Sequence, residues 1–164
     1  MSFSLSDFRR LRNAVAAGAL LLAPTLAHAE SAPFANYAGN WSGNGSITIA
    51  EGGTERIRCR GTYTASNGGK DLHLSLRCAS DSYKFELTSD IAANGGRISG
   101  SWSEATRSIN GDVQGNIADG QVTALVQTNG YAATFNITTR GNKQTVAINS
   151  KGELRAVNIS LTRG

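Results

Sequence analysis

Apolar and polar residues alternate with a period of two from Trp41 to the end of the chain, and this pattern constrains the fold most strongly. Such alternation places the apolar side chains on one face of a β-strand. Turn residues break the alternation about every dozen residues, and no helical period follows residue 30. The pattern therefore predicts an all-β protein.

Nine turns divide the chain into ten expected strands. The turns are Glu51-Gly52-Gly53, Asn67-Gly68-Gly69-Lys70, Ser80-Asp81, Asn94-Gly95, Ala105-Thr106, Asp119-Gly120, Asn129-Gly130, Gly141-Asn142 and Lys151-Gly152. Asn-Gly and Asp-Gly pairs favour two-residue hairpins, so consecutive strands should pair antiparallel. A meander with one apolar face must hide that face, and closure into an up-and-down barrel is the simplest solution. A two-sheet sandwich is the alternative.

The turns also predict the register, because the residues that flank a two-residue turn must pair. The expected pairs are Ile117 with Val122, Val126 with Ala133, Ile137 with Val146 and, around Ser80-Asp81, Leu76 with Phe85 and Leu74 with Leu87. All of these pairs join apolar residues. One face of the sheet is therefore expected to be apolar throughout.

The two cysteines take opposite positions in the hairpin around Gly68-Gly69. The register there pairs Tyr63 with Leu74 and Cys59 with Cys78, on the apolar face. Directly opposed residues of two antiparallel strands lie within the range that a disulfide tolerates. We therefore predict a Cys59–Cys78 disulfide.

Residues 1–29 resemble a secretory signal peptide. Three arginines precede a short apolar stretch, and Ala27-His28-Ala29 supplies the small residues that a signal peptidase accepts. We expect cleavage after Ala29, a short lead over 30–38 and one barrel domain over 39–164. Arg9-Arg10 allows a twin-arginine export route as an alternative. The expected location is the periplasm or the medium, where disulfides persist.

Charge and composition exclude some partners. Cleavage would remove three arginines and one aspartate, so the formal net charge would fall from +4 to +2. This charge is too small to suggest nucleic acid. An outer-membrane barrel would show similar alternation, but it would carry aromatic girdles, and here glycines lie on the apolar face. We expect a soluble monomer.

The first expected strand carries a family resemblance. Gly39-Asn40-Trp41 resembles the G-x-W start of the first strand in calycins, the barrels that include lipocalins, fatty-acid-binding proteins and avidins. The resemblance implies that Trp41 closes the barrel floor and that an arginine near the chain's end, Arg163 or Arg155, stacks on it. The whole chain also resembles small exported proteins of alphaproteobacteria, which implies a periplasmic location and no particular chemistry.

An aromatic and aliphatic row across the apolar face is the candidate ligand site. The residues are Trp41, Tyr63, Leu74, Leu87 and Trp102, with Phe85 nearby and Arg155 as an inward charge for an anion contact. Such a row either stacks a flat or acyl ligand or simply fills the core. Glycines on the same face either leave a cavity open or let the sheet coil tightly.

Charged residues offer a second kind of site. Glu104 and Arg107 flank a turn and are expected to form an ion pair at the rim. A basic patch is expected on the outer face, formed by Arg56, Arg58, Arg60, Arg77 and Lys84. Such a patch either docks on anionic envelope lipid or an acidic partner, or is a solvated surface. His73 is expected to point outward.

The sequence carries no spaced set of metal ligands, no nucleophile motif and no cofactor motif. We therefore expect no metal, no cofactor and no catalytic activity. Three functional classes remain: a barrel that binds an apolar or lipid-like small molecule, a structural or partner-binding envelope protein that uses its basic face, and an enzyme. The first is favoured.

Overall fold

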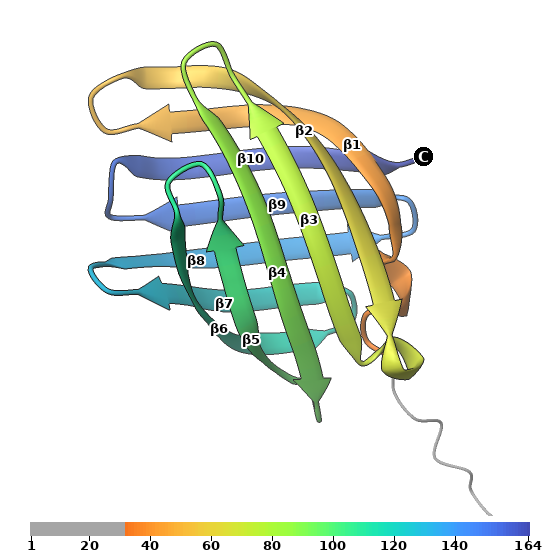
Figure 1. Cartoon of the computed structure of the whole chain (residues 1–164). Helices are drawn as coiled ribbons and strands as arrows, with labels where there is room; N and C mark the ends of the chain where they lie inside the picture. Colours follow the sequence, from red (N-terminus) through yellow and green to blue (C-terminus); the bar gives the residue numbers. More distant parts are fainter. Residues whose placement is uncertain (1–31) are drawn as a thin grey trace, which may run out of the picture.

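Ten antiparallel strands form one closed barrel in the structure, a computed structural model that describes residues 32–164 (Figure 1). The strands are β1 (Gly39–Ile49), β2 (Gly53–Ser66), β3 (Asp71–Ala79), β4 (Lys84–Asn94), β5 (Arg97–Glu104), β6 (Ile109–Ala118), β7 (Gln121–Thr128), β8 (Tyr131–Arg140), β9 (Lys143–Ser150) and β10 (Leu154–Arg163). Two short 3₁₀ turns accompany them, η1 (Ala35–Tyr37) and η2 (Asn67–Gly69). No helix in this part of the chain is long and apolar enough to cross a membrane. The predicted signal peptide lies outside the described residues.

Each strand pairs with its neighbours in the chain, and β1 pairs with β10 to close the circle. This closure confirms the barrel and excludes the sandwich. The register predicted from the two-residue turns is confirmed for β6 through β9: Ile117 pairs with Val122, Val126 with Ala133 and Ile137 with Val146. Residues on the apolar face point into the barrel, where they form one continuous core.

The predicted register is wrong by two residues where the turn is longer than a dipeptide. Leu76 pairs with Leu87 rather than Phe85, because the β3–β4 loop spans residues 80–83. The Ser80 hydroxyl oxygen accepts the Tyr83 N–H at 3.0 Å, which stabilises this wider loop. The β4–β5 turn is a dipeptide, but it is Gly95-Gly96 rather than Asn94-Gly95, and this places Trp102 opposite Ser89, two residues from its expected partner Leu87. The β1–β2 loop spans residues 50–52 and places Trp41 opposite Gly61, two residues from its expected partner Tyr63. A shift of two keeps every side chain on its predicted face.

The predicted disulfide is present. Cys59 and Cys78 are directly opposed on β2 and β3, with 4.1 Å between their Cα atoms. Both residues are buried on the inner face. The bridge therefore joins two neighbouring strands from inside the barrel.

Glycines on the inner face allow the strands to bend. A Cβ at Gly43 would lie 1.9 Å from the Ser160 carbonyl oxygen of β10, and one at Gly100 would lie 1.9 Å from that of Asp90 on β4. No side chain fits at these distances, so the neighbouring backbone occupies the space. The glycines therefore serve the curvature of the sheet rather than the opening of a cavity.

One end of the barrel is closed by the segment before β1. Phe34, Tyr37 and Trp41 are almost fully buried there. The Phe34 N–H donates to the Gly69 carbonyl at 2.9 Å, the Tyr37 hydroxyl donates to the Gly120 carbonyl at 3.0 Å, and the Trp41 indole N–H donates to the Tyr37 carbonyl at 2.8 Å. These bonds hold the aromatic floor against the loops around it.

Arg163 fastens the floor from outside. Its guanidinium lies 5.2 Å from the centre of the Trp41 ring and donates to the carbonyls of Asn36, Ala38 and Gly141 at 3.2, 2.9 and 2.9 Å. The family resemblance offered Arg163 or Arg155 for this role, and the structure selects Arg163. One side chain thus joins the start of the barrel to its last strand and to the β8–β9 loop.

We predict that Arg163→Ala lowers the free energy of unfolding by about 1–3 kcal/mol, because it leaves several carbonyls without a charged donor and uncovers Trp41. Arg155→Ala is the matched control, since Arg155 is exposed and its one hydrogen bond joins the Lys151 carbonyl. Urea denaturation followed by tryptophan fluorescence measures both. Equal stability of the two variants would contradict the role of Arg163.

Candidate ligand-binding cavity

The barrel interior is hollow at the end opposite the aromatic floor. The cavity has a volume of about 230 Å³. Its wall is formed by aromatic and aliphatic side chains of β2 to β10: Tyr63, Leu74, Leu76, Phe85, Leu87, Trp102, Ile109, Val126, Tyr131, Phe135, Ile137, Val146, Ile148 and Leu154. Its mouth lies among the loops β3–β4, β5–β6 and β9–β10, at Tyr83, Glu104, Arg107 and Glu153.

The structure places five residues of the predicted ligand site in this wall: Tyr63, Leu74, Phe85, Leu87 and Trp102. Trp41 is not among them. It belongs to the floor, where Tyr63 packs against it with 6.1 Å between ring centres. Trp41 and Trp102 share the inner face but lie at different depths along the barrel axis, so they do not form one row.

The prediction that Arg155 points into the barrel is wrong. The β1–β10 register shifts between Thr48 and Ile49, so that Ile49 pairs with Leu154 and Thr48 with Ala156. This β-bulge reverses the alternation. Leu154 lines the cavity in place of Arg155, and Arg155 is exposed.

Tyr131 is a wall residue that the sequence reasoning missed. Its ring lies 6.3 Å from that of Trp102, and the two planes are tilted by 52°. The alternation carried the signal, because Ala133 on the same strand is buried on the inner face and Tyr131 precedes it by two residues. The two aromatic rings together form one side of the cavity.

Polar groups deep in the barrel bind one another. The Tyr63 hydroxyl donates to Gln144 Oε1 at 3.0 Å, and Gln144 Nε2 donates to Thr139 Oγ1 at 2.9 Å. Burial strongly raises the pKa of the Tyr63 hydroxyl, with a smaller contribution from Tyr37. Tyr63 is therefore neutral at physiological pH, and its hydroxyl already has a protein partner.

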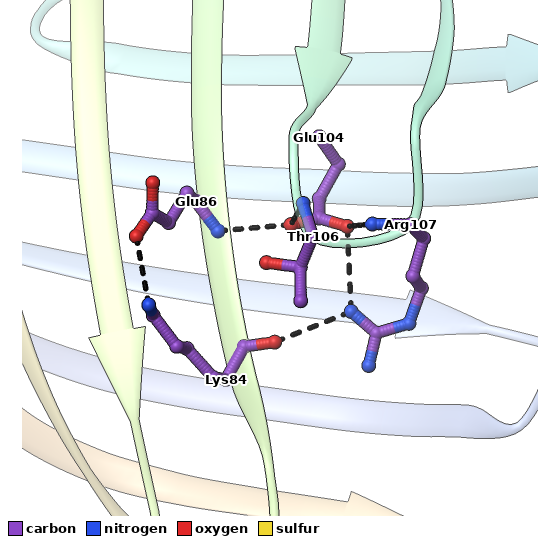
Figure 2. A network of polar contacts seen from close by, with 5 residues as sticks. All are labelled: Lys84, Glu86, Glu104, Thr106 and Arg107. Atoms are coloured by element: carbon purple, nitrogen blue, oxygen red, sulfur yellow. Dashed lines mark hydrogen bonds and ion pairs between the residues drawn. The ribbon is translucent and has the colours of Figure 1, made fainter.

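Glu104 organises the mouth of the cavity (Figure 2). Its carboxylate accepts the backbone N–H groups of Glu86, Thr106 and Arg107, each at 2.9 Å. Arg107 adds the predicted ion pair at 3.3 Å. The Arg107 guanidinium also lies 4.2 Å from the centre of the Tyr83 ring and donates to the Lys84 carbonyl at 3.3 Å. The carboxylate thus holds the β5–β6 loop against β4.

Burial by itself would raise the pKa of Glu104, yet the three backbone N–H groups and the Thr106 side chain together outweigh it, and the pKa lies below its usual value. Glu104 is therefore ionised over the physiological range. The N–H groups around the carboxylate and the Arg107 guanidinium compensate its charge, so the charge is not available to a ligand in the cavity.

The predicted basic patch lies on the outer face of the barrel, but only its three residues on β2 lack an acidic partner in the described chain. Arg77 and Lys84 lie 3.7 and 3.0 Å from the Glu86 carboxylate, so both are paired. Arg56, Arg58 and Arg60 are exposed, and none of them has an acidic partner within residues 32–164. We call these three residues the arginine strip. His73 points outward as predicted and lies 2.6 Å from Asp90.

No group of metal-ligating side chains gathers in the described part of the chain. The wall of the cavity holds no paired nucleophile and base among its residues. The absence of catalytic activity stays a prediction.

No protein-family model and no curated protein sequence matches the chain. Solved structures of other proteins are similar to it, among them the following two. The crystal structure of Rv2717c from M. tuberculosis has a TM-score of 0.64 at 10% identity, over 79% of this chain and 94% of that one. The S-type phycobiliprotein lyase CPES from Guillardia theta has a TM-score of 0.50 at 14% identity, over 80% and 90%. At these identities the similarity shows the fold alone, which fits the calycin-like barrel that Gly39-x-Trp41 predicted.

We predict that Glu104→Gln lowers the free energy of unfolding at pH 7 by about 1–3 kcal/mol, because an amide cannot replace a carboxylate that accepts four N–H groups. The difference should also depend on pH. The pKa is lowered by folding, so the carboxylate stabilises the fold above its ordinary pKa of 4.5, and this contribution is lost as the pH falls through the folded pKa.

Urea denaturation of both proteins between pH 3 and 7 measures the effect. Other acidic residues lose their contributions equally in both proteins, so the difference isolates Glu104. A stability difference that is the same at pH 3 and pH 7 would contradict the account.

Proposed function

We propose that this protein is an exported barrel that binds a small apolar molecule, lipid-like or planar, in its cavity. The observation that supports the proposal is the wall itself: fourteen aromatic and aliphatic side chains surround a hollow that opens at one end. Apolar walls with few polar groups are typical of small-molecule sites. A core built only for stability would close this space, because empty volume costs free energy.

The volume limits the ligand. An engineered cavity of about 150 Å³ accepts benzene, and sites for drug-sized ligands begin at about 300 Å³. A cavity of about 230 Å³ lies between these values. It suits one or two fused rings or a short acyl chain, and a longer chain would extend through the mouth.

Export is part of the proposal. It is supported by the signal-peptide pattern of residues 1–29 and by the Cys59–Cys78 bridge, since disulfides persist in oxidising compartments. The intact mass of the exported protein tests both features. A chain that begins at Glu30 and lacks two hydrogens supports the proposal, and an uncleaved chain with free thiols contradicts it.

We predict that naphthalene quenches the fluorescence of Trp102 and raises the melting temperature with increasing free concentration. Val126→Phe should abolish both effects, because position 126 lines the cavity and a ring there fills it. Leu125→Phe is the matched control: it lies next in the chain, points outward and is 40% exposed. Fluorescence titration and calorimetry measure the change.

Binding that survives in Val126→Phe would place the ligand elsewhere, and an unchanged melting temperature of the original protein would overturn the proposal. Val157→Ala serves as a stability control, because Val157 is fully buried but does not line the cavity. It should lower the melting temperature without weakening the binding of naphthalene.

A second candidate function uses the arginine strip. Three exposed arginines repeat along one strand without acidic partners in the described chain, and their β1 neighbours Ser46, Asn44 and Ser42 are uncharged. An anionic lipid surface attracts such a strip, with about 1 kcal/mol for each basic residue near it. We infer peripheral contact with anionic envelope lipid.

We predict that Arg58→Ser/Arg60→Ser weakens binding to phosphatidylglycerol vesicles at low salt by at least about tenfold. Arg97→Ser/Arg140→Ser removes the same charge from the closed end of the barrel and is the control. Vesicle sedimentation measures both. Equal weakening in the two variants, or no binding by the unaltered protein, would contradict the role of the strip.

A further inference from the structure

The indole N–H of Trp102 is the exception in an interior whose polar groups are otherwise bonded. Trp102 is 6% exposed, and its Nε1 is buried without a hydrogen-bond partner in the described chain. Leaving a buried donor unsatisfied costs free energy, so it calls for an explanation. The second indole shows the usual arrangement, because Trp41 Nε1 donates to the Tyr37 carbonyl.

This N–H belongs to a residue of the cavity wall and lies against the backbone of β6 and β7. Trp102 lines the cavity and pairs with Gly111 on β6. A Cβ at Gly111 would lie 1.8 Å from the Gln127 carbonyl oxygen of β7 and 3.0 Å from Nε1, so no side chain fits between the indole and the neighbouring backbone. Nε1 nevertheless makes no hydrogen bond to that carbonyl. Tyr131 covers the indole from β8. The indole thus lies between the backbone of Gly111 and Gln127, the Tyr131 ring and the hollow.

The other polar groups of the wall are already hydrogen-bonded within the protein or lie at the mouth. Tyr63 donates to Gln144, and Glu104 accepts four N–H groups. Tyr83, Arg107, Tyr131 and Glu153 retain some exposure near the mouth, where water reaches them. A ligand that enters the cavity therefore meets one unused buried donor.

We propose that the ligand carries one uncharged hydrogen-bond acceptor, such as a ketone or ester carbonyl, which accepts the indole N–H of Trp102. The inference rests on the proposed function and narrows its substrate class. An uncharged acceptor fits because the cation nearest the cavity, Arg107, is engaged by Glu104. A buried anion would then lack a free partner, which is costly.

Two probes of equal size separate the acceptor from the apolar surface. Acetophenone carries a carbonyl where ethylbenzene carries a methylene, and the ring is the same. The chain has two tryptophans, so the NMR spectrum shows two indole N–H signals. Acetophenone should shift the Trp102 signal downfield relative to ethylbenzene. The Trp41 signal should stay in place, since its N–H is already bonded.

Affinity gives an independent measurement. Trp102→Phe keeps an aromatic ring and removes the donor. The ratio of the acetophenone affinity to the ethylbenzene affinity should fall by about threefold to tenfold, the contribution of one hydrogen bond. Leu87→Val is the control, because it lines the same cavity without a polar group and should affect both probes alike.

The outcomes distinguish the two proposals. If neither probe binds the unaltered protein, the proposed function fails. If both bind but the Trp102 signal responds equally to each and the affinity ratio survives Trp102→Phe, only the acceptor inference fails. If Trp102→Phe does not fold, the NMR comparison on the unaltered protein decides.

Discussion

The pairing of β1 with β10 is the interaction on which the rest of the molecule depends. It removes both free edges of the sheet, so no strand is left to pair with another chain. It also turns the whole apolar face inward. Five inner glycines make the closure possible, because their backbones approach neighbouring carbonyls more closely than any side chain allows.

Ten strands enclose more space than their own side chains fill. A barrel of about eight strands is just wide enough to be filled by its interior residues. Here the extra width is used in two ways. Phe34 and Tyr37 of the segment before β1 fill one end together with Trp41 at the start of β1, and Arg163 holds them in place. The other end has no such plug, and the cavity lies there. The floor provides rigidity, and the mouth provides access.

The sequence predicted the strands, the face of the sheet on which each side chain lies, and much of the register, because alternation and dipeptide turns are local signals. It failed where structure depends on the length or the exact position of a turn. The four-residue loops after β3 and β5 shift the register by two, and hydrogen bonds of Ser80 and Glu104 that hold these loops are not visible in a turn dipeptide. The bulge near Ile49 is similarly hidden, and it turns Arg155 outward.

The residues of the candidate site were predicted only in part, because the sequence signals are local. Alternation gives the face of a residue but not its depth along the barrel axis, which depends on how strands tilt and stagger. Trp41 and Trp102 were therefore placed together, although one closes the floor and the other lines the cavity. The sequence could not predict that the indole N–H of Trp102 lacks a partner, since this depends on which acceptors lie within hydrogen-bond distance of it in the folded barrel.

The proposed function depends on the apolar hollow at the open end of the barrel. A crystal structure of the protein under xenon pressure tests it most directly, because xenon occupies dry apolar cavities. The account predicts a xenon atom among Leu87, Trp102 and Val126, inside the wall. An interior without xenon, with side chains collapsed into the space, would contradict it.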